Sequence, residues 1–277
     1  MTRRMMGFVI LLCAALAGCT RETQAAALRL GTTYTVEQSG ALALLDSLRP
    51  SIPVRVVIAS SGQIIHSAAA GNLDVVVTHA PTLEQRLLVD PGHVALRCPF
   101  VASRFAIVGP AADPAQTRTA ASAAEAFRRI ATRRAVFVSR ADSSGTHIKE
   151  LALWSAVGQP SGPRAPWYVQ AGVDQIATLR LADERAAYAL ADLPTFTRLA
   201  ERGTDLRVLF TADTVLINPY TLYVIRSASE HSGAARFSTW ALADWRARLL
   251  ALRLPDGTAA FAPLAGGCSA PAVAAER

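Results

Sequence analysis

The sequence predicts an α/β fold in which helices cover a parallel sheet. Short apolar runs of strand length alternate with amphipathic segments of helix length along most of the 277 residues. Turns rich in hydroxyl groups or containing glycine follow three of the predicted strands, at residues 31–35, 60–62 and 139–147. Since ligands of open α/β sheets bind outside the carboxyl ends of the strands, these three turns form the candidate site.

The first third of the chain carries the clearest alternation. Strands are expected at 28–30, 53–58 and 73–77, because each is a short apolar run. The two helices between them show apolar residues on one side, namely Leu42, Leu45 and Leu48 in the first and Ile64, Ile65 and Ala68 in the second.

The rest of the chain continues the pattern after a strong strand, Phe105 to Pro110. Further strands are expected at 135–138, 187–190 and 206–210. Helices are expected at about 120–132, after 147, from 171–176 onward, at about 192–201, and around Phe237, Trp240, Ala241 and Trp245. The last residues, from about 264, are expected to be disordered.

The turn at 139–147 joins the strand at 135–138 to a predicted helix. Ser143, Ser144 or Thr146 could serve as the N-cap of that helix. One face of the helix is expected to be apolar and to consist of Ile148, Leu151, Ala152, Ser155 and Ala156, with Lys149, Glu150 and Trp154 around it.

Such a turn is suited to an anion. Free N–H groups and the positive end of the helix dipole point toward one place. Gly145 allows close approach to the backbone, and Arg140 supplies a planar, permanently charged donor. Taken alone, the turn fits a well-capped helix with a surface arginine equally well, but three such turns favour an anion site.

The first residues form a targeting segment. Arg3 and Arg4 precede a short apolar stretch that ends in Leu16-Ala17-Gly18-Cys19, which resembles a bacterial lipobox. We expect a signal peptide at 1–18, lipid on Cys19, a tether at 19–27, and a location outside the cytoplasmic membrane. An ordinary secretory signal with a coincidental cysteine is the alternative.

Composition and motifs exclude several classes of function. Removal of residues 1–18 leaves 26 basic against 21 acidic residues, a modest positive balance without the basic, aromatic-rich runs of nucleic-acid-binding proteins. No metal site or cofactor is expected, because Cys and His spacing fits none. Ser144, His147 and Asp142 lie too close in sequence for a hydrolase triad, so we expect no enzyme. Export permits a disulfide between Cys98 and Cys268, and free thiols fit equally well.

Together these features resemble the substrate-binding component of tungstate ABC transporters. The most specific match is the run from Ser139-Arg140 through Ser144-Gly145-Thr146-His147, followed by Glu150-Leu151 and Trp154. Other matching motifs are Thr32-Thr33, Ser61-Gly62-Gln63, Asp74-Val75-Val76 with His79, Ile107 to Pro110, Trp167-Tyr168, Ala171-Gly172, Ala177-Thr178-Leu179 and Asn218-Pro219-Tyr220.

The resemblance implies a two-lobed periplasmic-binding-protein fold of type II, with the ligand in the cleft. Lobe 1 is expected to comprise 28–103 plus 217–263, and lobe 2 to comprise 104–216. The implied ligand is tungstate or molybdate, captured by a monomer for an ABC permease and ATPase. The family's ligand-contacting positions fall on Thr32, Thr33, Ser61, Arg140, Ser144, Gly145 and Thr146.

Two aspartates decide which anion fits. Tungstate and molybdate are unprotonated dianions that need donors only, whereas phosphate keeps a proton and benefits from an acceptor. Asp142 is expected to orient Arg140 or to accept N–H groups of its turn. Asp174, where the family has a Gly-rich stretch, is expected to be an exposed first-turn residue. Phosphate or sulfate, or an anion sensor without transport, are the alternatives.

Overall fold

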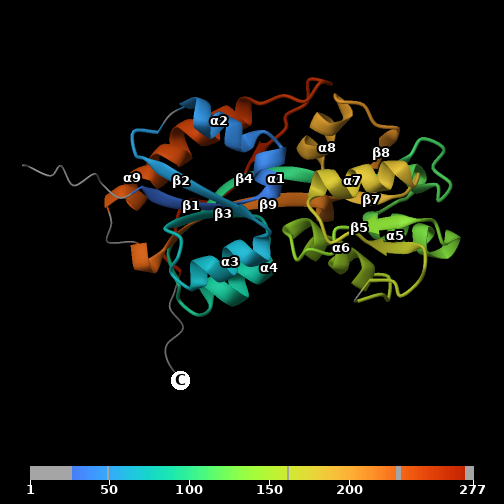
Figure 1. Cartoon of the computed structure of the whole chain (residues 1–277), viewed down its shortest axis with the longest axis horizontal. Coiled ribbons are helices and arrows are strands. Elements are labelled where there is room, and N and C mark those ends of the chain that lie inside the picture. Colours follow the sequence, from blue (N-terminus) through green and yellow to red (C-terminus); the bar gives the residue numbers. More distant parts are fainter. Residues whose placement is uncertain (1–26, 49, 161, 229–231, 272–277) are drawn as a thin grey trace, which may run out of the picture.

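The computed structural model describes residues 27–48, 50–160, 162–228 and 232–271. The predicted signal peptide, Cys19 and most of the tether lie outside the described residues. Figure 1 shows two bodies side by side, with two long strands running from one to the other.

The elements of the first body come mainly from the start of the chain. They are β1 (Leu28–Thr33), α1 (Tyr34–Gln38), α2 (Ala41–Leu48), β2 (Val54–Ala59), α3 (Ser61–Ala69), β3 (Val75–Thr78), α4 (Pro81–Glu84) and a π turn (Gln85–Val89). The strands and helices expected there are confirmed to within a few residues.

The middle of the chain forms the second body. After β4 (Val94–Pro110) come α5 (Ala123–Arg133), β5 (Phe137–Ser139), α6 (Gly145–Ser155), β6 (Tyr168–Gln170), α7 (Gln175–Glu184), β7 (Ala189–Asp192), α8 (Leu193–Ala200) and β8 (Leu206–Phe210). Short 3-10 turns occupy Thr117–Thr119 and Thr214–Leu216.

The chain then returns to the first body. It does so through β9 (Ile217–Ile225), a 3-10 turn (Arg226–Ala228), α9 (Ser232–Trp240), a π turn (Ala241–Trp245), α10 (Arg246–Ala251) and β10 (Ala262–Pro263). The long helix expected around Phe237 is therefore one helical segment that a π turn divides.

The sheet is mixed rather than parallel throughout. In the first body β2, β1 and β3 are parallel as predicted, but β9 pairs antiparallel with β3, and β4 in turn pairs antiparallel with β9. The 17-residue β4 pairs with β9 up to Arg104 and with β7 and β8 from Phe105 on. Antiparallel strands arise because β4 leaves the first body and β9 returns along it.

The buried apolar side chains form four clusters that separate at the crossing strands. Two clusters draw their buried members from residues up to Val101 and from Tyr220 on. The other two draw theirs from Phe105 to Leu216. The lobe boundaries expected from the sequence remain a prediction, and this separation of cores supports them.

The buried face of α6 differs from the expected one. The expected face contained Ala152, Ser155 and Ala156, which are exposed, whereas Leu153 and Trp154 are buried. Trp154 packs against Phe127 and Phe137 with ring centroids 4.5 and 5.2 Å apart. The large ring buries more apolar surface than several alanines, so it decides which face turns inward.

The expected disorder from 264 on is wrong for residues 264–271. Cys98 and Cys268 form a disulfide with a Cα–Cα distance of 4.2 Å, and Ser269 pairs with Arg97 through two backbone hydrogen bonds of 2.9 Å. The sequence left this pairing open. The disulfide holds the segment around Cys268 against β4. The composition of that segment alone, which is mostly small residues, does not predict an ordered structure.

Candidate functional site

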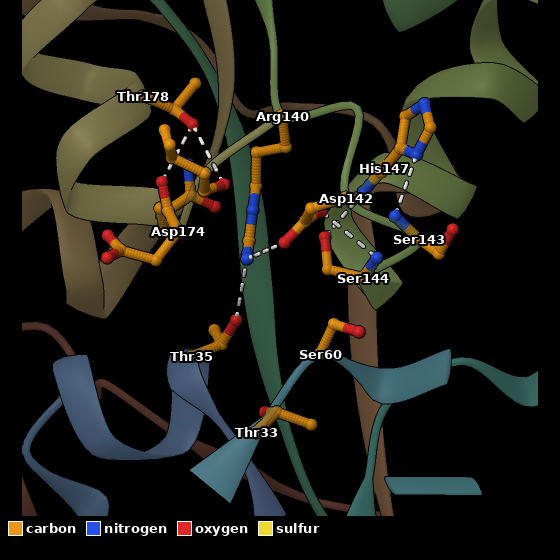
Figure 2. Close-up of polar contacts among 12 residues, drawn as sticks. Thr33, Thr35, Ser60, Arg140, Asp142, Ser143, Ser144, His147, Asp174 and Thr178 are labelled. Carbon is orange, nitrogen blue, oxygen red and sulfur yellow. Dashed lines mark hydrogen bonds and ion pairs between the residues drawn. The ribbon is translucent and has the colours of Figure 1, made fainter. Parts of the chain in front are cut away.

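Three helices begin at the carboxyl ends of strands, where the sequence placed the hydroxyl-rich turns. Thr33 is the N-cap of α1, Ser60 of α3 and Ser144 of α6. Each cap hydroxyl accepts a hydrogen bond from an N–H of the first turn, which satisfies one otherwise unpaired donor. Figure 2 shows these caps gathered around Arg140.

The start of α3 is neutral and locally satisfied. Ser60 Oγ accepts from Gln63 N–H at 3.4 Å, and Gln63 Oε1 accepts from Ser60 N–H at 3.2 Å, which is a capping box. Ser61 and Gly62 follow the cap and are buried.

The start of α6 is charged. Ser144 Oγ accepts from His147 N–H at 3.2 Å, and Asp142 Oδ1 accepts from Ser144 N–H at 3.1 Å. Ala141 and Ser143 flank the aspartate with φ of 49° and 59°, a left-handed conformation that costs L-residues energy. The turn therefore holds a strained shape around Asp142.

The two helix starts touch across the predicted lobes. Gly145 N–H donates to Ser61 Oγ at 3.0 Å, and Gly62 N–H donates to Ser143 O at 3.3 Å. A Cβ on Gly145 would lie 2.5 Å from the backbone oxygen of His79, so only glycine permits this approach. The sequence predicted glycine at 145 for close approach of a ligand. In the structure the backbone of His79 is what approaches Gly145 closely.

Arg140 extends from the end of β5 into this junction and is 1% exposed. Its Nη2 donates to Asp142 Oδ2 at 2.5 Å, and its Nη1 lies 3.5 Å from Thr35 Oγ1. Among the described residues, its Nε has no hydrogen-bond partner. Burial lowers the pKa of Arg140 while Asp142 raises it, and an arginine stays charged under such conditions.

The groove beside these helix starts has a volume of about 1020 Å³. It is lined from both predicted lobes, by Tyr34, Ser60, Gly62, Gln63, His66, Leu83, Arg86, Asp142, Ser143, Gly172, Val173 and Asp174. The residues predicted to contact the ligand are not among these lining residues.

The predicted ligand residues fall into two groups. Ser61, Arg140, Ser144, Gly145 and Thr146 are buried and lie together where α3 meets α6. The Thr146 hydroxyl lacks a hydrogen-bond partner among the described residues, so it is free to donate to a ligand.

Thr32 and Thr33 form the second group. The hydroxyl of Thr32 donates to Val77 O at 3.2 Å, which ties β1 to β3, and Thr33 caps α1. Both hydroxyls have protein partners, and these two positions remain a prediction.

The two aspartates have distinct places. Asp142 holds Arg140 and accepts a turn N–H, the two roles expected of it. Asp174 is the N-cap of α7 rather than a first-turn residue, since its Oδ1 accepts from Ala177 N–H at 3.0 Å. Asp174 lines the groove beside Arg140, and Figure 2 shows Arg140 between the two carboxylates.

The predicted ligand residues do not include Thr35, which contacts Arg140, and the helical pattern did not predict that Glu150 is buried. Thr35 lies in the first turn of α1, two residues after a cap that the spacing alone could have identified. Glu150 lies on the buried face of α6, where it accepts from Tyr168 Oη at 2.7 Å and from Trp154 Nε1 at 3.2 Å. Burial raises the pKa of Glu150 to about 7.

A buried polar network joins the crossing strands. Asp192 accepts from Ser103 Oγ and from Asn218 Nδ2, and His79 Nδ1 donates to Asn218 Oδ1 at 3.0 Å. Burial lowers the pKa of His79 to about 4, so this ring is neutral near pH 7. Ser103 and Asn218 face each other on β4 and β9, where the chain passes between the two bodies.

The described part of the chain contains no cluster of three or more His, Cys, Asp or Glu residues that could hold a metal ion. Within the same residues, no helix is long and apolar enough to cross a membrane.

Comparisons with known proteins agree with this architecture. Residues 20–244 match the PBP superfamily domain. The tungstate-binding protein TupA of Peptoclostridium acidaminophilum is 32% identical over 259 residues, which are 85% of this chain and 88% of that protein. A Haloferax volcanii protein, whose name assigns it to ABC-transporter anion binding, is 37% identical over 223 residues; the match covers 76% of this chain but only 61% of that protein's length.

A solved structure is also similar. The tungstate ABC transporter structure from Geobacter sulfurreducens has a TM-score of 0.69 and 35% identity, over 78% of this chain and 94% of that chain. The α/β binding-protein fold that the sequence predicts is thereby confirmed.

Proposed function

The chain belongs to the periplasmic binding protein (PBP) superfamily, and from that premise we propose that it captures a tetrahedral oxyanion for an ABC importer. Tungstate is the first candidate, as the names of the TupA protein and of the Geobacter structure suggest. Molybdate, which is likewise an unprotonated dianion, is the second. The protein binds and releases the anion without changing it chemically.

The buried guanidinium of Arg140 carries this proposal. It is 1% exposed, lies at the start of α6, and keeps its Nε without a partner among the described residues. A buried donor without an acceptor costs free energy, which an incoming oxyanion recovers. The unpartnered hydroxyl of Thr146, from the same turn, gives a second donor.

The supply of donors favours a fully deprotonated anion. The side chains of Ser61, Thr146 and Arg140 can all donate, and the Asp142 carboxylate is already occupied by Arg140 and Ser144. The proton of hydrogen phosphate would lack an acceptor in such a cleft. Sulfate meets the same donors and differs from tungstate mainly in its smaller size.

A titration panel tests the anion. Calorimetry with tungstate, molybdate, phosphate and sulfate on the chain lacking residues 1–19 should give the tightest binding for tungstate. If phosphate binds more tightly, and Asp174→Asn removes that preference, Asp174 is a ligand-facing acceptor and the assignment of tungstate is wrong.

Variants of Arg140 test the site. Arg140→Ala should weaken tungstate binding about tenfold to hundredfold, because a charged hydrogen bond contributes roughly 1.5–3 kcal/mol. Arg140→Lys should restore part of the loss, since lysine keeps the charge but lacks the planar fork. An unchanged dissociation constant in Arg140→Ala would place the site elsewhere.

We also propose that lipid on Cys19 anchors the protein outside the cytoplasmic membrane, where it meets the permease and ATPase. The lipobox sequence is the support for this anchor. Cys19→Ser should abolish incorporation of labelled fatty acid into the protein. Mature protein that starts at another residue and carries no lipid would contradict the anchor.

A further inference from the structure

Asp142 occupies the donors that an oxyanion would use at this turn. Its Oδ2 accepts from Arg140 Nη2 at 2.5 Å, and its Oδ1 accepts from Ser144 N–H at 3.1 Å. Figure 2 shows the carboxylate between the guanidinium and the start of α6. The Asp142 carboxylate therefore contacts both the guanidinium of Arg140 and the backbone at the start of α6.

This ion pair is largely shielded from water. The side chain of Arg140 is 1% exposed and that of Asp142 is 11% exposed. Salt and water screen such a pair much less than they screen a surface pair. The charges of Arg140 and Asp142 thus nearly cancel within the turn.

The backbone holds Asp142 in this place at a cost. The left-handed residues Ala141 and Ser143 lie on either side of it. Each costs roughly 1–2 kcal/mol in an L-residue, so the fold must stabilise the turn by other contacts. Gly62 N–H, which donates to Ser143 O, provides one of them from the facing helix.

On the basis of the proposed function, we propose that Asp142 is a built-in counter-anion of the binding site. In the empty cleft it neutralises Arg140 and occupies the start of α6. In the loaded cleft it repels the bound oxyanion and competes with it for Arg140. Asp142 thereby limits affinity and speeds release, which a protein that must hand its ligand to a permease requires.

The proposal makes a prediction that depends on ligand charge. Repulsion between Asp142 and the ligand is proportional to the product of their charges. Tungstate carries two negative charges, and perrhenate is a tetrahedral oxyanion of similar size with one. Removal of the Asp142 charge should therefore lower the logarithm of the dissociation constant about twice as much for tungstate as for perrhenate.

The experiment compares two ligands and two variants. Calorimetry on the full chain at fixed ionic strength gives the dissociation constants of tungstate and perrhenate for the wild type, Asp142→Asn and Asp142→Ser. Both variants should bind tungstate at least about tenfold more tightly and perrhenate about threefold more tightly. Both should release tungstate more slowly in stopped-flow measurements. Thermal melting establishes that the variants are folded.

Asp213→Asn is the matched control. Asp213 also accepts two backbone N–H groups, from Ala123 and Val215, but it lies outside the groove, so the same loss of charge should leave both affinities unchanged. If folded Asp142 variants bind tungstate as the wild type does or more weakly, Asp142 only positions Arg140 and the inference is wrong. If the wild type binds no tungstate, the proposed function fails, and the inference with it.

Discussion

The starts of α3 and α6 contact each other beside the groove, and they satisfy their free N–H groups in different ways. At α3, Ser60 and Gln63 close a neutral capping box. At α6, Ser144 is helped by Asp142, whose carboxylate also holds Arg140. One helix start is neutral and complete in itself, and the other is built around an ion pair.

This difference assigns separate tasks to the two sides. The backbone before α6 is strained at Ala141 and Ser143, whereas no residue from 60 to 63 has a positive φ. Strain and buried charge concentrate where a site needs them, and a neutral facing surface can then close upon it. We therefore expect α6 to set the affinity for charge and α3 to complete the enclosure.

The glycines in the first turns of the two helices give the largest contrast. A Cβ on Gly145 would lie 2.5 Å from His79 O, but a Cβ on Gly62 would lie 3.3 Å from Ser143 O. Gly145→Ala should keep the lobes apart and weaken tungstate binding about tenfold to hundredfold, as overpacking costs roughly 1–3 kcal/mol. Gly62→Ala should change it by only about threefold. Equal losses in calorimetry would show that the two contacts are equivalent.

The buried carboxyl of Glu150 on α6 predicts a pH effect. Burial raises the pKa of Glu150 to about 7 from an ordinary value of 4.5. Between these values the folded protein holds a proton that the unfolded chain has released, so stability falls as the pH rises through this range. The loss should be on the order of 1–3 kcal/mol.

Glu150→Gln should lack this part of the pH dependence. Glu84 and Asp192, whose pKa values burial also raises, are present in both proteins, so the difference between the two isolates Glu150. Urea unfolding at pH 5 and pH 8 measures it. Parallel stability curves for the two proteins would show that Glu150 has an ordinary pKa.

Removal of the two cap hydroxyls should have the smallest effect. Ser60→Ala and Ser144→Ala should each lower the free energy of unfolding by about 1 kcal/mol, a typical value for an N-cap. Only Ser144→Ala should also weaken tungstate binding, because Ser144 orders the turn that carries Arg140. A similar loss of affinity in Ser60→Ala would contradict the division of tasks between the helices.

The sequence predicts what depends on local patterns. The strands, most helices and the three turns follow from residue spacing and turn chemistry. The same chemistry limited the N-cap of α6 to Ser143, Ser144 or Thr146, of which the structure selects Ser144. The buried face of α6 was missed because counting apolar positions gave Trp154 too little weight against several alanines. Composition likewise favoured a disordered tail, whereas Cys268 pairs with a cysteine 170 positions away.

Long-range contacts account for most of the remaining differences. Ser61 and Gly145 are 84 positions apart, and nothing local to either predicts that one donates to the other. Thr32 is a second contact that local sequence does not predict, because its hydroxyl donates to the backbone oxygen of Val77 on another strand. The turn between a strand and a helix at 139–147 is confirmed. The contacts of Asp142 with Arg140 and Ser144 within it depend on side-chain placement, which the sequence does not give.

The most direct test of the account is the position of tungsten in a crystal grown with tungstate, located by anomalous scattering. If the oxyanion site is the one proposed, we expect one strong peak at the start of α6, with ligand oxygens about 3 Å from the Arg140 guanidinium and from Thr146 Oγ1. A peak in the outer groove beside Arg86 and His66, with the pair of Arg140 and Asp142 undisturbed, would contradict it.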